Sequence, residues 1–229
     1  FYENIKEYFL PNGTVVFQSF TWSFIKKKKF NLYSSIPDTG AIEKYIFNKP
    51  GILRSIHPTN SVISFGKNKK FITKDHGLHS FGANSPYDKF LKLNLKFVNV
   101  GIPFEDTCTY VHHLEHINGS NHRFNKIISG SVFLNNRYKK KRFFIFVKFK
   151  EISNKIERDE KKFCNFLRRN KKLVSVIDNK VLFSKIKCED VYSYGLKFLK
   201  NDSSFFMKKN IDVKFLEKKK KIRNNLLVF

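Results

Sequence analysis

The sequence predicts an α/β protein, with a three-layer α/β/α fold around a mixed central sheet. Short apolar runs bounded by Gly, Pro and Asn alternate along the chain with segments whose apolar residues recur at helical spacing. The 229 residues are 41% apolar and 16% aromatic, a composition that supplies a core and excludes general disorder. We therefore expect a single domain over residues 1–229.

The elements follow one another in a regular order. A helix over Tyr2–Phe9 is broken by Pro11-Asn12-Gly13 and leads into a buried strand, Thr14–Phe17. No strand precedes this unit and the chain opens with Phe1, so we expect a truncated N-terminus. The basic tail from Lys218 to the end is expected to fray. Further expected helices span residues 42–47, 85–91, 107–117, 157–170 and 189–199, and further strands span residues 61–65, 96–100, 142–149 and 180–185.

The charge is strongly positive, with 45 Lys and Arg against 19 Asp and Glu. Only 8 of the basic residues are Arg, whereas a surface selected for nucleic acid favours Arg. The basic runs Lys26–Lys29, Lys139–Arg142 and Lys218–Lys221 are also scattered along the sequence. We expect compositional drift and no specific nucleic-acid partner, although a basic nucleic-acid-binding protein remains an alternative.

The apolar runs and the cysteines bear on membrane association and on cellular location. No apolar run approaches the ~18 residues of a membrane-spanning helix, so no membrane partner is expected. The three Cys are odd in number and lack metal-site spacing, which argues against a disulfide framework and a zinc site. A reducing cytoplasm is the expected location. The sequence does not indicate an oligomeric state.

His112 and Glu115 have the sequence spacing of an acid–base pair on a helix. His112 and Glu115 are three residues apart on the helix expected over 107–117, so they share a face. A carboxylate beside an imidazole fixes its tautomer and raises its proton affinity, as a general base requires. By spacing alone, an ordinary surface pair is the more frequent explanation. His116 lies one turn further, but the His-Glu-x-x-His order of a helical zinc site is absent, so no metal is expected.

Two polar segments lie beside expected strands. Thr21 and Ser23 flank Trp22 just after the first strand, and the loop from Arg54 through His57 runs to Ser61 at the start of another. Polar groups at strand ends are common ligand-binding positions in α/β folds. A strand terminus with core contacts and an ordinary turn are the alternative explanations.

Four blocks in this order resemble the aminoglycoside 3-N-acetyltransferase family. Gly13–Phe24 is similar to its Gly-Thr-…-Thr-Phe-Thr segment, and Arg54–Ser61 to its Arg-Ser-x-His-Pro-x-x-Ser block. Ser85-Pro86 resembles its helix start, and Thr109-x-x-His112-x-x-Glu115 its Thr-x-x-His-x-x-Glu helix. The blocks lie between residues 13 and 123.

The resemblance implies transfer of an acetyl group from acetyl-CoA to an amine of an amino sugar, either an aminoglycoside antibiotic or a nucleotide-linked amino sugar. His112 would act as base on the amine in a direct attack, and Glu115 would orient and charge-stabilise the imidazole. A covalent route through Cys108 ranks lower, and a catalytically degraded paralogue is a further alternative. The resemblance places four residues near the cofactor, namely Thr21, Ser23, His57 and Ser61. It places Trp22 and Asp106 near the substrate.

Overall fold

The structure is a computed structural model that describes residues 2–150, 157–208 and 218. The chain forms two compact units, and neither is one continuous stretch of sequence. The first unit comprises the residues up to Lys89 together with Lys126–Ile145, and the second unit comprises Phe90–Asn125 and the residues from Phe146 onward. The two units are described separately. The expected single domain stays a prediction, and the expected fraying tail lies outside the described residues apart from Lys218.

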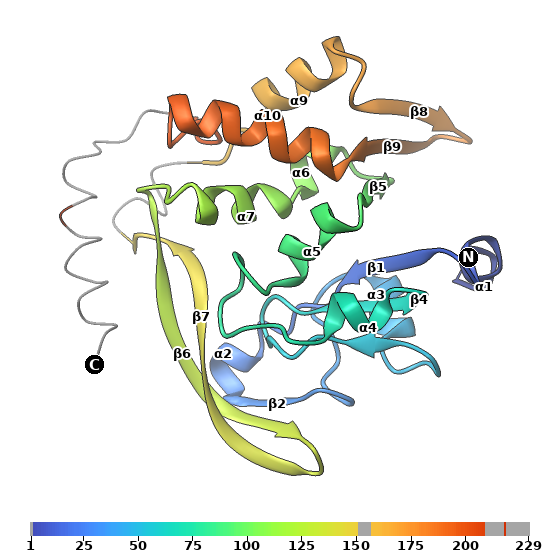
Figure 1. Ribbon diagram of the computed structural model, residues 1–229, viewed down its shortest axis with the longest axis vertical. Helices are drawn as coiled ribbons and strands as arrows, with labels where there is room; N and C mark the ends of the chain where they lie inside the picture. Colours follow the sequence, from blue (N-terminus) through green and yellow to red (C-terminus); the bar gives the residue numbers. More distant parts are fainter. Residues whose placement is uncertain (1, 151–156, 209–217, 219–229) are drawn as a thin grey trace. The chain divides into compact units, whose positions relative to one another are not determined.

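The first unit contains an antiparallel sheet of three strands in the order β1-β4-β3. A cluster of apolar side chains that includes Tyr2, Ile46, Ile63 and Phe65 packs against it. The strands are β1 (Thr14–Gln18), β3 (Leu53–Arg54) and β4 (Val62–Gly66), and the helices are α1 (Tyr2–Phe9), α3 (Ala41–Ile46) and α4 (Lys69–Thr73) (Figure 1).

A second sheet is built on a long hairpin. Strands β6 (Arg123–Leu134) and β7 (Arg137–Lys148) are joined by Asn135 and Asn136, whose positive φ angles of 50° and 60° are those of a tight two-residue hairpin turn. The short strand β2 (Lys29–Asn31), which follows α2 (Phe24–Lys27), adds to β6 in parallel (Figure 1). The buried rings of Phe24, Phe30 and Phe143 pack beneath this sheet.

The second unit contains an antiparallel sheet in the order β5-β9-β8. Asn179 and Lys180, both with positive φ, form the two-residue turn between β8 and β9. The strands are β5 (Lys96–Val100), β8 (Val174–Asp178) and β9 (Val181–Lys187). The helices are α6 (Phe104–Thr107), α7 (Tyr110–Ile117), α9 (Lys161–Arg169) and α10 (Cys188–Asn201). The residues of helix α5 (Pro86–Lys92) are divided between the two units, up to Lys89 in the first and from Phe90 in the second.

The α/β class is confirmed, but the single mixed central sheet is not what the described residues form. They form three separate three-stranded sheets, of which only β2-β6-β7 is mixed. Two of the sheets contain a hairpin closed by a two-residue turn, β6-β7 and β8-β9, and such a turn joins neighbouring strands antiparallel. Strands β1 and β4, and strands β5 and β9, are antiparallel across longer connections.

Two helix boundaries also differ from the prediction. The helix expected over 107–117 is two helices, because Cys108 leaves the helical region with a ψ of 79°. The helix expected over 157–170 begins only at Lys161. The residues just before it are extended instead, since Arg158 bridges to Met207 and the Asp159 amide donates to the Phe206 carbonyl. Within the described part of the chain, no helix is both long enough and apolar enough to span a membrane.

Candidate active site

Helix α7 carries Glu115 into the interior of the second unit. Val111 and Leu114 on this helix are fully buried, and α10 approaches them closely at a glycine. A Cβ on Gly195 would lie 2.4 Å from Leu114 Cδ1, so any side chain at this position would force Leu114 to shift. This packing leaves the Glu115 side chain 1% exposed. A carboxylate buried to this degree requires charged or hydrogen-bonding partners.

Three basic side chains surround the Glu115 carboxylate. His112 Nδ1 lies 2.7 Å from Oε2, and His122 Nε2 lies 2.8 Å from Oε1. Arg123 Nε forms an ion pair with Oε2 at 2.9 Å. His112 is on the same helix face, whereas His122 and Arg123 are brought back to it by the chain reversal after α7, where Gly119 has a φ of 71°. The spacing-based prediction that His112 and Glu115 meet is confirmed.

The electrostatics of this cluster favour an ionised Glu115 and a neutral His112. Burial acts to raise the pKa of Glu115, but the charges of Arg123 and His112 and the hydrogen bonds from His112 and His122 hold it well below its ordinary value. Burial and the charge of Arg123 lower the pKa of His112 to about 4, outweighing the opposite effect of Glu115. Glu115 does act to raise the pKa of His112, as expected, but the expected net rise is wrong, because burial and, next, the charge of Arg123 outweigh it.

A neutral imidazole is the form that accepts a proton. With Nδ1–H donating to the Glu115 carboxylate, the tautomer is set and Nε2 is the basic nitrogen. The His112 side chain is 16% exposed, whereas Glu115 is enclosed. The pair therefore has the arrangement of a general base with a fixed orienting carboxylate.

Sequence reasoning missed the role of His122 and Arg123. Neither residue is among the site residues that the sequence predicts. Both directly follow a helix that ends at a glycine turn, and both are almost fully buried. The available signal was physical: a carboxylate on the buried face of a helix needs a cation, and these are the first basic side chains after the turn.

In the first unit, Arg54 joins two of the predicted cofactor-binding residues. Its Nη2 donates to Thr21 Oγ1 at 2.6 Å and its Nε donates to Ser61 Oγ at 3.2 Å. Its guanidinium also donates to the carbonyls of Ser19 and Ser35, at 2.6 Å and 2.5 Å. Ser61 Oγ in turn donates to the Ser19 carbonyl. The hydroxyls of Thr21 and Ser61 thus brace the loop, and their contact with a cofactor stays a prediction.

His57 is enclosed in the same unit. Its ring stacks on His76 with centroids 5.2 Å apart, and its Nε2 lies 3.4 Å from the Phe144 carbonyl. Burial lowers the pKa of His57 to about 3, so the ring is neutral. The predicted role of His57 at the cofactor also stays a prediction.

The remaining predicted residues are nearer the surface. Trp22 is 53% exposed in the first unit, and the Ser23 amide donates to Asp38 Oδ2 at 2.7 Å. Asp106 is exposed on α6 of the second unit, and its neighbour Glu105 is paired with Arg168 at 2.5 Å. The predicted catalytic pair therefore lies in the second unit with Asp106, and the other predicted site residues lie in the first unit.

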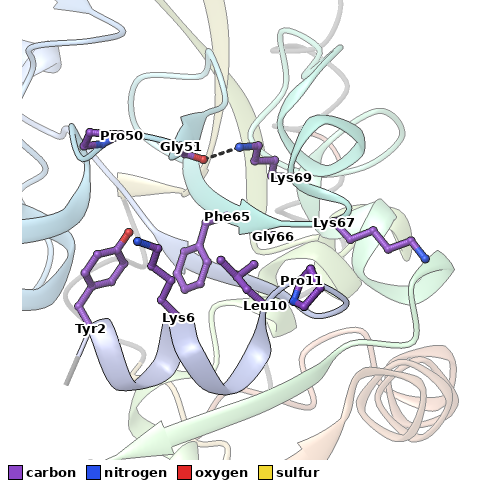
Figure 2. A pocket seen from close by; sticks show the side chains of 10 residues that line it. All are labelled: Tyr2, Lys6, Leu10, Pro11, Pro50, Gly51, Phe65, Gly66, Lys67 and Lys69. Atoms are coloured by element: carbon purple, nitrogen blue, oxygen red, sulfur yellow. Dashed lines mark hydrogen bonds between the residues drawn. The ribbon is translucent and has the colours of Figure 1, made fainter.

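A hollow of about 360 Å³ in the first unit contains none of these residues. It is lined by apolar groups that include Leu10, Pro11 and Phe65, with Lys6, Lys67 and Lys69 at its edge (Figure 2). Figure 2 also shows the Lys69 ammonium donating to the Gly51 carbonyl, at 2.7 Å. Because neither His112 nor Glu115 lies there, this hollow is not where we place the chemistry.

Comparison with known proteins identifies the family. The sequence profile of the family described as Aminoglycoside 3-N-acetyltransferase matches residues 1–196. The chain belongs to this family. Among curated members, the aminoglycoside N(3)-acetyltransferases III of a Salmonella species and of Enterobacter cloacae are each 31% identical to it over 77 residues. The aligned segment covers 33% of this chain and 27% of either relative.

Solved structures of aminoglycoside acetyltransferases share the fold of this family member. AAC-IIIb in a binary complex with CoASH has a TM-score of 0.68 at 19% identity, covering 83% of this chain and 78% of that one. AAC-VIa with bound sisomicin, in a room-temperature neutron/X-ray structure, has a TM-score of 0.72 at 17% identity, covering 83% and 80%. At these identities the likeness establishes the fold.

Proposed function

We propose that this aminoglycoside 3-N-acetyltransferase family member transfers an acetyl group from acetyl-CoA to a primary amine of an amino sugar. The observation that carries the proposal is the 2.7 Å contact between His112 Nδ1 and the buried Glu115 carboxylate, at the positions that match the family's Thr-x-x-His-x-x-Glu motif. Family membership supports it, as do the relatives solved with CoASH and with sisomicin.

In the proposed reaction, His112 accepts one proton and later donates it. The amine nitrogen attacks the thioester carbonyl carbon, and His112 Nε2 takes the proton that the nitrogen must lose. The carbon–sulfur bond then breaks, the thiolate leaves, and the same proton passes to the sulfur. The products are an amide and free CoA thiol. Glu115 stabilises the transient imidazolium, and Arg123 with His122 hold that carboxylate in place.

A direct attack is favoured over an acetyl-cysteine intermediate. Cys108 is buried, and burial is the main cause that raises the pKa of its thiol far above its ordinary value. The thiolate, which is the nucleophilic form, is therefore disfavoured. All three cysteines are buried free thiols, which supports a reducing cytoplasm as the location.

The exposure of the predicted residues separates those that can touch a cofactor or acceptor from those that support the loop. Of the predicted residues in the first unit, Ser23 and Trp22 are the ones accessible to a ligand. Thr21, His57 and Ser61 are buried and would support the loops that carry the accessible residues. Aminoglycosides are polycations and require carboxylates, and Asp106 is an exposed carboxylate among our predicted residues. The acceptor is an aminoglycoside or a nucleotide-linked amino sugar.

The test is loss of turnover in the variant His112→Gln. A positioned base contributes about 10²–10⁴-fold in rate, so thiol release from acetyl-CoA should fall by that factor while the Kd for CoA changes little. His116→Gln, one turn further along α7, is the matched control and should retain most of the activity. Near-normal turnover in His112→Gln would show that the assigned base is wrong.

The acceptor is tested in the same assay. Kanamycin-type antibiotics and nucleotide-linked amino sugars are offered separately with acetyl-CoA, and thiol release identifies the substrate class. Because the pKa of His112 is about 4, protonation of this base should not reduce the activity between pH 8 and about pH 5, so a decline in that range reports on the acceptor amine or on folding. Thiol release with an arylamine or peptide amine, but with neither sugar class, would refute the amino-sugar assignment.

A further inference from the structure

Two basic runs that lie far apart in the sequence meet on the β2-β6-β7 sheet. Lys26–Lys29 forms α2 and the start of β2, and Lys139–Arg142 lies in β7. Lys29 Nζ lies 4.7 Å from the ring centroid of Tyr138, next to the second run. The two runs are far apart in the sequence, which argued against a nucleic-acid surface, but the fold brings them to the same sheet.

The register of the sheet places the side chains on a common face. Lys29 is paired with Ser131. The two-residue turn at Asn135 and Asn136 sets Phe133 opposite Tyr138, in agreement with their ring centroids 5.1 Å apart. Counting along the hairpin, Ser131 is then opposite Lys140 and Ser129 opposite Arg142. We call six residues of this face the basic face: Lys29, Ser129, Ser131, Tyr138, Lys140 and Arg142. Phe133, which is half-buried, lies on the same face beside Tyr138.

The composition of the basic face fits phosphate groups. Small hydroxyl side chains form its centre and cations stand on both sides, since Lys29 and Lys140 flank Ser131 in one row across three strands. All three cations and the Tyr138 side chain are exposed. The surrounding segments, residues 24–37 and 126–145, contain four and six basic residues and no Asp or Glu. These two segments therefore carry a net positive charge.

We propose that the basic face binds single-stranded nucleic acid, independently of base sequence. Successive same-face side chains on a strand are about 6.6–6.8 Å apart, so the cations follow an extended phosphate backbone. The exposed Tyr138 ring provides a stacking surface for an unpaired base, which a double helix does not offer. A lipid surface is the less suitable partner, because the face presents serine hydroxyls at its centre and a single exposed ring in place of an inserting apolar group.

The proposal is tested by fluorescence anisotropy of a labelled 12-residue oligouridylate with the full chain. The triple variant Lys29→Gln, Lys140→Gln, Arg142→Gln removes the cations of the face. The matched control Lys44→Gln, Lys49→Gln, Lys70→Gln removes the same charge elsewhere in the first unit. The control also matches the contact of Lys29 with the Tyr138 ring, since Lys49 Nζ lies 4.3 Å from the centroid of the Tyr45 ring.

We expect the basic-face variant to bind at least tenfold more weakly than the control variant. The slope of log K against log salt should become shallower by about 2, because each lost phosphate contact removes about 0.7 on a single strand. Tyr138→Ala should weaken binding about tenfold by loss of stacking, Tyr138→Phe should restore it, and Tyr45→Ala should have no effect. Equal urea midpoints verify that all variants are folded.

Three results would overturn the proposal. Equal weakening in both triple variants would assign the binding to net charge alone. Equal affinity of Tyr138→Ala and wild type would remove the base-stacking contact. Binding to phosphatidylserine vesicles that depends on the basic face, with oligouridylate binding that does not, would assign the face to a membrane. None of these measurements uses acetyl-CoA, so failure here leaves the acetyltransferase proposal untouched.

Discussion

Arg54 shows how one buried residue organises a loop through its hydrogen bonds. Its guanidinium donates to two carbonyls and two hydroxyls, and it lies 4.9 Å from the centroid of the Phe30 ring. Burial lowers its pKa to about 9, a measure of how enclosed the cation is. The planar fork of arginine can reach these four acceptors together, and the ammonium of lysine cannot.

We therefore predict that Arg54→Lys lowers the free energy of unfolding by about 3 kcal/mol, since each hydrogen bond to a charged group contributes about 1.5–3 kcal/mol. Urea denaturation measures the change. Arg137→Lys, at an exposed position of β7, is the control and should change stability by less than about 0.5 kcal/mol. Equal effects of the two substitutions would contradict the bracing role of Arg54.

The sequence predicted the contact between His112 and Glu115 because helical spacing is a local property. It did not predict the pairing of Glu115 with His122 and Arg123, because that contact depends on the chain reversal at Gly119. It also misjudged the pKa of His112, since the direction depends on the burial of the ring and, next, on the charge of Arg123. Local geometry could be predicted from the residues, whereas the charge balance required the fold.

Among the elements, the crossing of α7 and α10 determines where the candidate catalytic helix sits. Gly195 allows the two helices to approach, because a Cβ there would overlap Leu114 and lie within 3.6 Å of Phe163. Leu114 precedes Glu115 directly, so a displacement of α7 at this point moves the carboxylate and the imidazole together.

Gly195→Ala should destabilise the protein by about 1 kcal/mol or more, because overpacking a filled core costs about 1–3 kcal/mol. This cost outweighs the preference of a helix for alanine over glycine, which is about 1 kcal/mol. Thermal denaturation provides the measurement. Ser193→Ala on the exposed side of α10 is the control and should be neutral or slightly stabilising. Adding Leu114→Val should recover part of the loss, and the absence of recovery would show that the contact is not limiting.

Elements with strong patterns could be predicted from the sequence, and weakly patterned ones could not. α1, β1, β4, α5, β5 and α10 lie where apolar periodicity or Gly and Pro breaks indicated them. The strands β2, β6 and β8 were missed. Each carries polar or exposed residues, as in β8, whose five residues are all exposed, so no buried face marks it in the sequence. The pairing of β6 and of β8 comes from a two-residue turn, and that of β2 from a long-range parallel contact with β6.

At the scale of the whole molecule, buried neutral histidines make stability depend on pH. Burial is the largest cause of the lowered pKa of His76, and the neighbouring His57 adds to it. His57 has a pKa of about 3 and His112 of about 4. Below the unfolded value of about 6.5, the unfolded chain binds protons that the folded protein does not bind. Stability is therefore complete above about pH 6.5 and decreases as the pH falls.

We predict that the free energy of unfolding is level between pH 8 and 7 and falls below pH 6.5, by up to about 1.4 kcal/mol per pH unit for each such histidine. Urea denaturation at pH 7.5, 6.0 and 5.0 checks this. His76→Gln should give a shallower dependence between pH 6.5 and 5, whatever its stability at pH 7.5. A level profile for the wild type down to pH 5 would contradict the burial of neutral imidazoles.

The interrupted first unit has a consequence for synthesis on the ribosome. Its first 89 residues emerge before Lys126–Ile145, yet Phe30 pairs with Val132 and His57 contacts the ring of Phe143, with centroids 5.1 Å apart. The 56 residues from 90 to 145 take about 3 to 11 s to add at about 5–20 residues per second. During that interval the nascent chain carries aromatic side chains, Phe30 among them, whose core partners have not yet been synthesised.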